Sequence, residues 1–254
     1  AADENLLKQL ENAAITWTQS WDFLPLDYAM EFVRDDANMM SQPGGRTFRY
    51  FPASGFVLPV NIENAVKAGI ISEEYAHLAE KELRFNFRKG GMFNSDARGL
   101  SREEVMMMDI LANFDWKRGI YFSSPGGSDV AKALYGQGIV HNYGQVHGLA
   151  PLRREEANDY VRELMYDNIM NKYDYANLAA DGALVDYYTR RHTSQYRNSF
   201  IDLVSKYISD YELSKNRPAN DSTSGSSNLK DTQYYADRIE SVINYSLEKL
   251  PIAK

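Results

Sequence analysis

Cysteine is absent from the 254 residues, so disulfides and cysteine-ligated zinc sites are excluded. No apolar run approaches the length of about 20 residues that a membrane-spanning helix needs. The opening segment, AADENLLKQLENAA, has no basic region followed by an apolar one, so we expect no signal peptide. His141 and His147 are expected to face each other across a hairpin, but a metal would need carboxylates beside them. We therefore assign no metal site and no cofactor.

Basic residues are in the minority, at 28 against 35 acidic ones, which gives a net charge of -7. This balance argues against a nucleic-acid partner, because a general nucleic-acid binder needs a basic face. The hydrophobic content of 44% is sufficient for a core. The length fits one large domain or two small ones.

The most complete local pattern is SREEVMMMDILANFDWKRGIYFSS, residues 101–124, which predicts a helix, a charged turn and a strand. Ser101 is a favourable N-cap, and Glu104 completes a capping box. The helix has a broad apolar face that three consecutive methionines widen, so we expect burial on more than one side. Residues 119–124 are expected to form a core strand, which a Pro-Gly-Gly turn closes.

Shorter patterns flank this stretch. Leu83, Phe85 and Phe87 alternate with polar residues, which predicts a half-buried strand. The runs RYF and FVLPV, within residues 48–60, predict a hairpin. The other expected elements are helices at residues 5–21, 28–34, 62–67, 73–81, 130–134 and 155–173, and two short strands within residues 138–152.

Two amphipathic helices, residues 185–211 and 231–250, are expected to form a hairpin with a mobile linker at residues 214–229. The expected fold class is α+β: a mixed α/β domain with a small, mostly antiparallel or mixed sheet, followed by a tetratricopeptide-like helical hairpin. We divide the chain into an N-terminal helix (residues 1–21), the α/β domain (22–180) and the hairpin (181–254).

Gly126, Gly127 and Ser128 are the first candidates for binding. They lie between a strand and a helix, where backbone amides are able to approach a phosphate. The segment lacks the spacing of a phosphate-binding motif. The alternative is a β-turn in which Ser128 or Asp129 caps the helix.

Tyr188, Arg190 and Arg191 form an aromatic and basic cluster at the start of the long C-terminal helix. Such a cluster suits a sugar or a phosphate. The alternative is that the tyrosines pack and the arginines pair with surface acids.

Asp109 and Asp115 are the carboxylates nearest the charged turn. Acid–base catalysis needs two positioned carboxylates, or a nucleophile with a base. Asp109 lies amid an apolar helix, so we expect a partner such as Arg84, Arg88 or Arg118, and a structural ion pair is the favoured interpretation. No catalytic residue is assigned.

The segment MMDILANFDWKRGIYF, residues 107–122, resembles a run of the form LMILDILANNDWKRPIYF in a bacterial family of polytopic membrane proteins first catalogued as of unknown function. Gly119 stands where that family usually has proline. Further segments from about residue 26 on match in the same order, namely LDYAMEFVRDD, RYFPASGFVLPVN, ELMYDNIMNKYDYAN and YYTRRHTSQYRNSFIDL. In that family the run follows many transmembrane helices.

That family is similar to GT-C glycosyltransferases of the protein O-mannosyltransferase type, which use a lipid-linked sugar donor. Their catalytic acid belongs to the membrane portion, so the resemblance carries none over to this chain. It implies an extracytoplasmic, periplasmic part of a membrane-anchored parent. The implied partners are the membrane portion of the same polypeptide and an acceptor protein or glycan. The corner Asp115-Trp116-Lys117-Arg118 is where we expect contact with the membrane portion.

The expected function is a non-catalytic accessory domain that presents an acceptor, gates the sugar site or binds a partner. One alternative is a protein-interaction module unrelated to glycosylation. The other is a free-standing sugar-binding or sugar-active protein, which requires two carboxylates facing each other in a cleft with aromatic walls.

Overall fold

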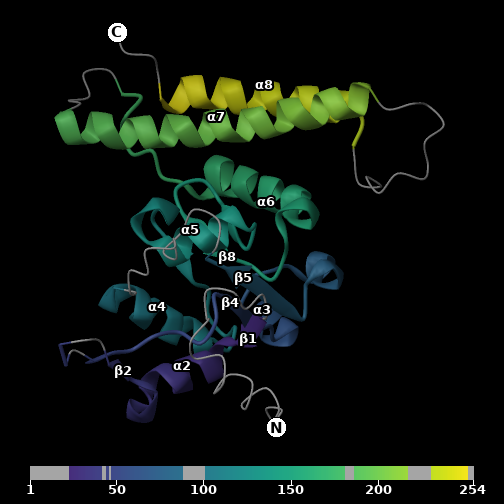
Figure 1. The fold of residues 1–254 in the computed structure, drawn as a ribbon. Coiled ribbons are helices and arrows are strands. Elements are labelled where there is room, and N and C mark those ends of the chain that lie inside the picture. Colours follow the sequence, from purple (N-terminus) through teal and green to yellow (C-terminus); the bar gives the residue numbers. More distant parts are fainter. Residues whose placement is uncertain are drawn as a thin grey trace. The chain divides into compact units, whose positions relative to one another are not determined.

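The computed structural model describes residues 23–41, 44–45, 47–87, 101–180, 186–216 and 230–250 (Figure 1). The expected N-terminal helix, Arg88 and residues 217–229 of the expected linker therefore lie outside the described residues. The chain forms two units, Ala1–His141 with Gly148–Glu156 and Asn142–His147 with Ala157–Lys254. Most of the helix expected at residues 155–173 thus groups with the second unit, whereas the sequence analysis assigned it to the α/β domain.

The first unit contains a three-stranded sheet in the order β1 (Phe23–Pro25), β4 (Gly55–Pro59) and β5 (Glu82–Asn86). β4 pairs parallel with β1 and antiparallel with β5, so the sheet is mixed. The predicted alternation in β5 is confirmed, because Leu83 and Phe85 are fully buried. Phe56 of β4 lies opposite Phe85, with the ring centroids 5.7 Å apart. Aromatic side chains on one face of the sheet therefore form much of the core.

The hairpin predicted within residues 48–60 is wrong. β3 (Thr47–Phe48) pairs antiparallel with β2 (Met40–Ser41) instead, and β4 pairs with β1 and β5. The Pro-Ala-Ser-Gly segment is not an exposed turn, because residues 51–56 are all buried. The chain runs through the core at this point: RYF, residues 49–51, lies in no strand, and FVLPV contributes to β4.

The helices of the first unit are α2 (Leu26–Arg34), α3 (Ile62–Lys67), α4 (Arg102–Ala112) and α5 (Asp129–Gly136), with 3-10 turns at Asp36–Asn38, Glu73–Leu78 and Pro125–Gly127. α4 begins at the predicted capping box. It buries one face only, since Met108 and Leu111 are inaccessible whereas Met106 and Ile110 are 65% and 58% exposed. The expectation of burial on more than one side is wrong for Met106 and Ile110, although α4 contacts both α2 and α5.

A second three-stranded sheet has the order β6 (Tyr121–Phe122), β8 (His147–Leu149) and β7 (Val140–Asn142). The core strand expected at residues 119–124 is therefore a two-residue edge strand. Tyr121 is 58% exposed because β6 has a neighbour on one side only.

The second unit contains α6 (Arg154–Asp167), a π-helical turn (Asn168–Lys172), α7 (Tyr187–Lys215) and α8 (Thr232–Lys249). α7 and α8 pack side by side as the predicted helical hairpin (Figure 1). The buried core of this unit consists of Met165, Ile169, Tyr175, Phe200, Leu203, Tyr207, Tyr235, Val242 and Leu250. The expected α+β fold class with a C-terminal hairpin is thereby confirmed, and the likeness to a tetratricopeptide unit stays a prediction. None of the helices within the described ranges is long and apolar enough to cross a membrane.

Candidate functional site

Trp116 is the anchor of the expected corner rather than part of its exposed surface. Its side chain is 1% exposed, and Nε1 donates a hydrogen bond to the carbonyl oxygen of Pro59 at 2.9 Å. The Phe114 ring lies against it, with the centroids 4.6 Å apart. The backbone of Trp116 has φ = 63°, a conformation that residues with large side chains rarely adopt. A buried indole therefore holds the chain in a sharp turn directly after α4.

The charged residues of the corner lie on the surface around this anchor. The carboxylate of Asp115 accepts from the backbone amide of Lys117 at 3.1 Å and pairs with Lys117 Nζ at 2.7 Å. Asn64 Nδ2 donates to the Asp115 carbonyl at 2.8 Å, which ties the corner to α3. The hydrogen bonds from the Lys117 side chain and backbone lower the pKa of Asp115. Asp115 therefore stays ionised near neutral pH, and Arg118 is exposed beside it.

Asp109 forms an ion pair, as favoured, but its partner is Arg34 of α2. Of the expected partners, Arg84 pairs with Glu82 instead, and Arg118 lies on the exposed corner. The Arg34 and Asp109 side chains are 55% and 42% exposed, so the pair lies at the surface. No local pattern indicates Arg34 as the partner, because the contact depends on how α2 packs against α4.

The Gly126-Gly127-Ser128 turn starts α5. The Ser128 hydroxyl accepts from the amides of Val130 and Ala131 at 3.1 and 3.4 Å, which matches the capping alternative. The amide of Asp129 donates to Glu104 Oε1 at 3.3 Å, and Glu104 Oε2 accepts from the amide of Ser101 at 3.0 Å. A carboxylate of the protein therefore already meets the amide at the start of α5.

His141 and His147 do not gather metal ligands. The buried His141 ring contacts the Leu152 carbonyl through Nε2 at 3.0 Å. Burial lowers the pKa of His147, and the nearby carboxylate of Asp202 opposes this effect in part. Within the described ranges there is no group of three histidine, aspartate or glutamate side chains that could hold a metal ion.

Tyr188, Arg190 and Arg191 lie exposed on the first turns of α7. Tyr187 and Tyr188 are 72% and 69% exposed and contact each other edge to face at 5.5 Å. The expectation that the tyrosines pack into the protein is wrong, because both lie exposed on the first turn of α7, which Asp186 caps. This cluster belongs to the second unit and Asp115 to the first, so each is a separate candidate.

A buried cation in the second unit escaped the sequence analysis. Arg162 of α6 is 3% exposed; its guanidinium donates to Asp159 at 2.9 Å and also to Asp210 of α7. The same group lies over the rings of Tyr207 and Tyr235, 5.4 Å from each centroid. Burial opposes the charged form, but the charges of Asp210 and Asp159 outweigh it and raise the pKa of Arg162. The cluster therefore joins three helices around a permanent charge.

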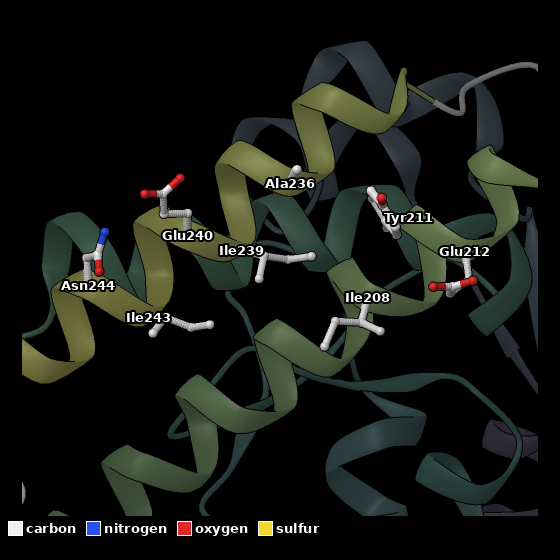
Figure 2. A pocket seen from close by; sticks show the side chains of 8 residues that line it. All are labelled: Ile208, Tyr211, Glu212, Ala236, Ile239, Glu240, Ile243 and Asn244. Atoms are coloured by element: carbon white, nitrogen blue, oxygen red, sulfur yellow. The ribbon is translucent and has the colours of Figure 1, made fainter.

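An apolar groove of about 510 Å³ between α7 and α8 was also missed. Ile208, Ile239 and Ile243 point into the space between the two helices, and Glu212 and Glu240 lie on opposite sides of it (Figure 2). Ile208 and Ile243 remain 46% and 42% exposed, although their helical spacing suggested core positions. Spacing alone does not distinguish a face that packs inside the protein from one that a partner covers.

Comparison with protein families identifies the family to which most of the chain belongs. The model of the family described as TMEM260-associated domain 2 matches residues 3–169. This range contains the corner and the Gly126–Ser128 turn, and it ends within the π-helical turn that precedes α7. No curated protein and no solved structure matches the chain.

Proposed function

We infer a function from the premise that this chain belongs to the TMEM260-associated domain 2 family. We propose a non-catalytic accessory domain of a polytopic membrane protein that resembles GT-C glycosyltransferases. The domain lies on the extracytoplasmic side, in the periplasm of a bacterial parent. The family name, which associates the domain with a transmembrane protein, and the ordered match of segments from residue 26 on both support this assignment.

The corner carries the proposal. Because the indole of Trp116 is buried and hydrogen-bonded to Pro59, the backbone that presents Asp115, Lys117 and Arg118 is held in one conformation. Exposed charges on an anchored backbone suit electrostatic docking, which fixes register and orientation. We propose that the membrane portion of the same polypeptide docks here. Docking would let the domain gate the sugar site or present an acceptor protein or glycan.

A binding experiment tests the docking surface. The membrane portion, produced without this domain and held in nanodiscs, is passed over immobilised chain. We expect the wild type to retain it and the double variant Lys117→Glu with Arg118→Glu to bind at least tenfold more weakly. The matched control is Arg190→Glu with Arg191→Glu, which makes the same change of charge on α7 and should bind like the wild type. Equal binding by the corner variant would reject the corner as the docking surface, and no binding by the wild type would reject docking.

The pairing of the carboxylates supports an accessory role over a sugar-active one. Asp109 and Asp115 each pair with a cation at the surface, and Asp115 remains ionised where a general acid must be protonated. Glu212 and Glu240 lie beside an apolar groove, but on opposite sides of it (Figure 2). Asp109 and Asp115, each held by its own cation, are therefore not the two free carboxyl groups that a sugar-active site places on either side of a sugar.

An activity assay tests this part of the proposal. The chain alone, given a lipid-linked mannose donor and an acceptor peptide, should neither transfer nor release sugar, whereas deletion of the domain should lower transfer by the parent at least tenfold. Transfer by the chain alone would establish the sugar-active alternative. Unchanged transfer after the deletion, with a partner still bound, would favour an interaction module unrelated to glycosylation; the exposed groove is the observation that favours that candidate.

A further inference from the structure

The α7–α8 groove has an apolar floor that continues along the hairpin. Its lining residues are Ile208, Tyr211, Glu212, Ala236, Ile239, Glu240, Ile243 and Asn244. Beyond the groove, Ile201 of α7 and Leu247 of α8 are 60% and 49% exposed. On α7, Ile201 lies about two helical turns from Ile208. On α8, Leu247 lies about two turns from Ile239. The apolar surface is thus an elongated track.

The charge at the groove has one sign. Glu212 and Glu240 are both exposed, and the lining contains no lysine or arginine. In the part of the chain that the structure describes, neither carboxylate takes part in an ion pair. A ligand that covers the isoleucines therefore meets two uncompensated negative charges, which favours a cationic flank.

We propose that the α7–α8 groove binds a basic amphipathic helix of a partner protein. The apolar side chains of such a helix, at positions i, i+3 or i+4, and i+7, contact the isoleucines of the groove. Its lysines or arginines then lie beside Glu212 and Glu240. A helix fits because it packs lengthwise against two side-by-side helices, as the third member of a bundle. This inference rests on the proposed accessory role. It adds a second partner site, which lies far from the corner in the sequence.

Two other occupants are disfavoured by the same charges. A second copy of the hairpin would bring Glu212 and Glu240 of one copy toward an equally acidic groove, and like charges across an interface oppose association. An anionic membrane surface attracts basic helices and repels an acidic rim. Both remain outcomes that the experiment distinguishes.

The experiment uses the whole chain and a fluorescein-labelled 18-residue helical peptide with leucines on one face and lysines on the other. We expect saturable binding by fluorescence anisotropy that weakens as salt is raised. Two peptide controls should bind at least tenfold more weakly, one with the same composition in scrambled order and one with glutamate in place of lysine.

Variants of exposed positions locate the site without disturbing the core. Ile208→Asn with Ile243→Asn should weaken binding of the lysine peptide at least tenfold. Leu213→Asn is the matched control, because Leu213 is 57% exposed on the same helix α7 and does not line the groove. Glu212→Lys with Glu240→Lys should reverse the preference, so that the glutamate peptide binds more tightly than the lysine peptide.

Each remaining outcome overturns the proposal. Three of these outcomes concern the peptide: no binding of the lysine peptide, equal binding of the scrambled peptide, or unchanged binding by the Ile208 and Ile243 variant. The other two concern different occupants: dimerisation that this variant abolishes, or capture by vesicles rich in phosphatidylserine. None of these results involves Lys117 or Arg118, so failure here leaves the docking proposal standing. Conversely, failure of docking in nanodiscs leaves peptide binding intact.

Discussion

The corner at Trp116 and the cluster at Arg162 bury opposite kinds of group. At the corner an aromatic side chain is buried and the charges of Asp115 and Lys117 remain in water. In the cluster a charge is buried, and the tyrosine rings of α7 and α8 lie around it. The corner needs one hydrogen bond to satisfy its indole, whereas the guanidinium needs carboxylates from two helices. The corner is therefore largely specified by local sequence, and the cluster by tertiary packing.

Arg162→Met gives the largest expected effect. Removing the cation leaves the carboxylates of Asp159 and Asp210 near each other without the buried charge that pairs with both, and breaking a buried pair in this way costs about 3–5 kcal/mol. Urea denaturation followed by circular dichroism at 222 nm measures the loss. Arg190→Met, on the exposed first turns of α7, is the control and should change stability by less than about 0.5 kcal/mol. An equally small effect at Arg162 would remove the contrast between the two regions.

Trp116→Phe tests the other side of the comparison. Phenylalanine keeps most of the buried ring but leaves the Pro59 carbonyl without its donor, which costs roughly 2 kcal/mol. The same denaturation experiment measures it. Tyr121→Phe removes a polar atom from an aromatic residue that is 58% exposed, and it should leave stability unchanged. If Trp116→Phe lowered the free energy of unfolding as much as Arg162→Met, the turn at Trp116, with its φ of 63°, would depend on more of the indole than its one hydrogen bond.

Ser101→Ala gives the smallest of the three losses in unfolding free energy, and it measures how much a local hydrogen bond at the surface contributes. The Ser101 hydroxyl accepts from the amide of Glu104 at 3.3 Å, and loss of such a cap costs about 1 kcal/mol. Ser72 is the matched control, because it occupies the N-cap of the 3-10 turn Glu73–Leu78 without a side-chain hydrogen bond. Ser72→Ala should therefore change the free energy of unfolding by only a few tenths of a kcal/mol. Equal losses at both serines would show that the capping box adds nothing beyond N-cap preference.

Elements whose cause is local were predicted well. The capping box of α4, the alternation in β5 and the amphipathic patterns of α7 and α8 each depend on spacing within one segment. The errors share a different cause. The partner strands of β4 come from residues 23–25 and 82–86, and no local turn signal indicates a parallel strand that precedes it by 30 residues.

The candidate residues divide in the same way. Ser128 was expected as a possible cap because serine before a helix has a local function. Arg34 as the partner of Asp109, and Arg162 as a buried cation, depend on helices that meet only in the folded protein. Exposure was the hardest property to predict, since Met106, Ile208 and Ile243 are as apolar as the core residues beside them.

Glu104 has a consequence for how the corner varies. Its carboxylate accepts from the amides of both Ser101 and Asp129, so it clamps the ends of a 24-residue excursion, residues 105–128, to one another. This segment is not an open loop, because it contains most of α4 and the buried side chains of Met108, Leu111 and Trp116, so the carboxylate joins the start of α4 directly to the start of α5. The corner lies inside this excursion. A substitution of the exposed charges of Asp115, Lys117 or Arg118 therefore leaves intact the bonds that fix the starting points of α4 and α5.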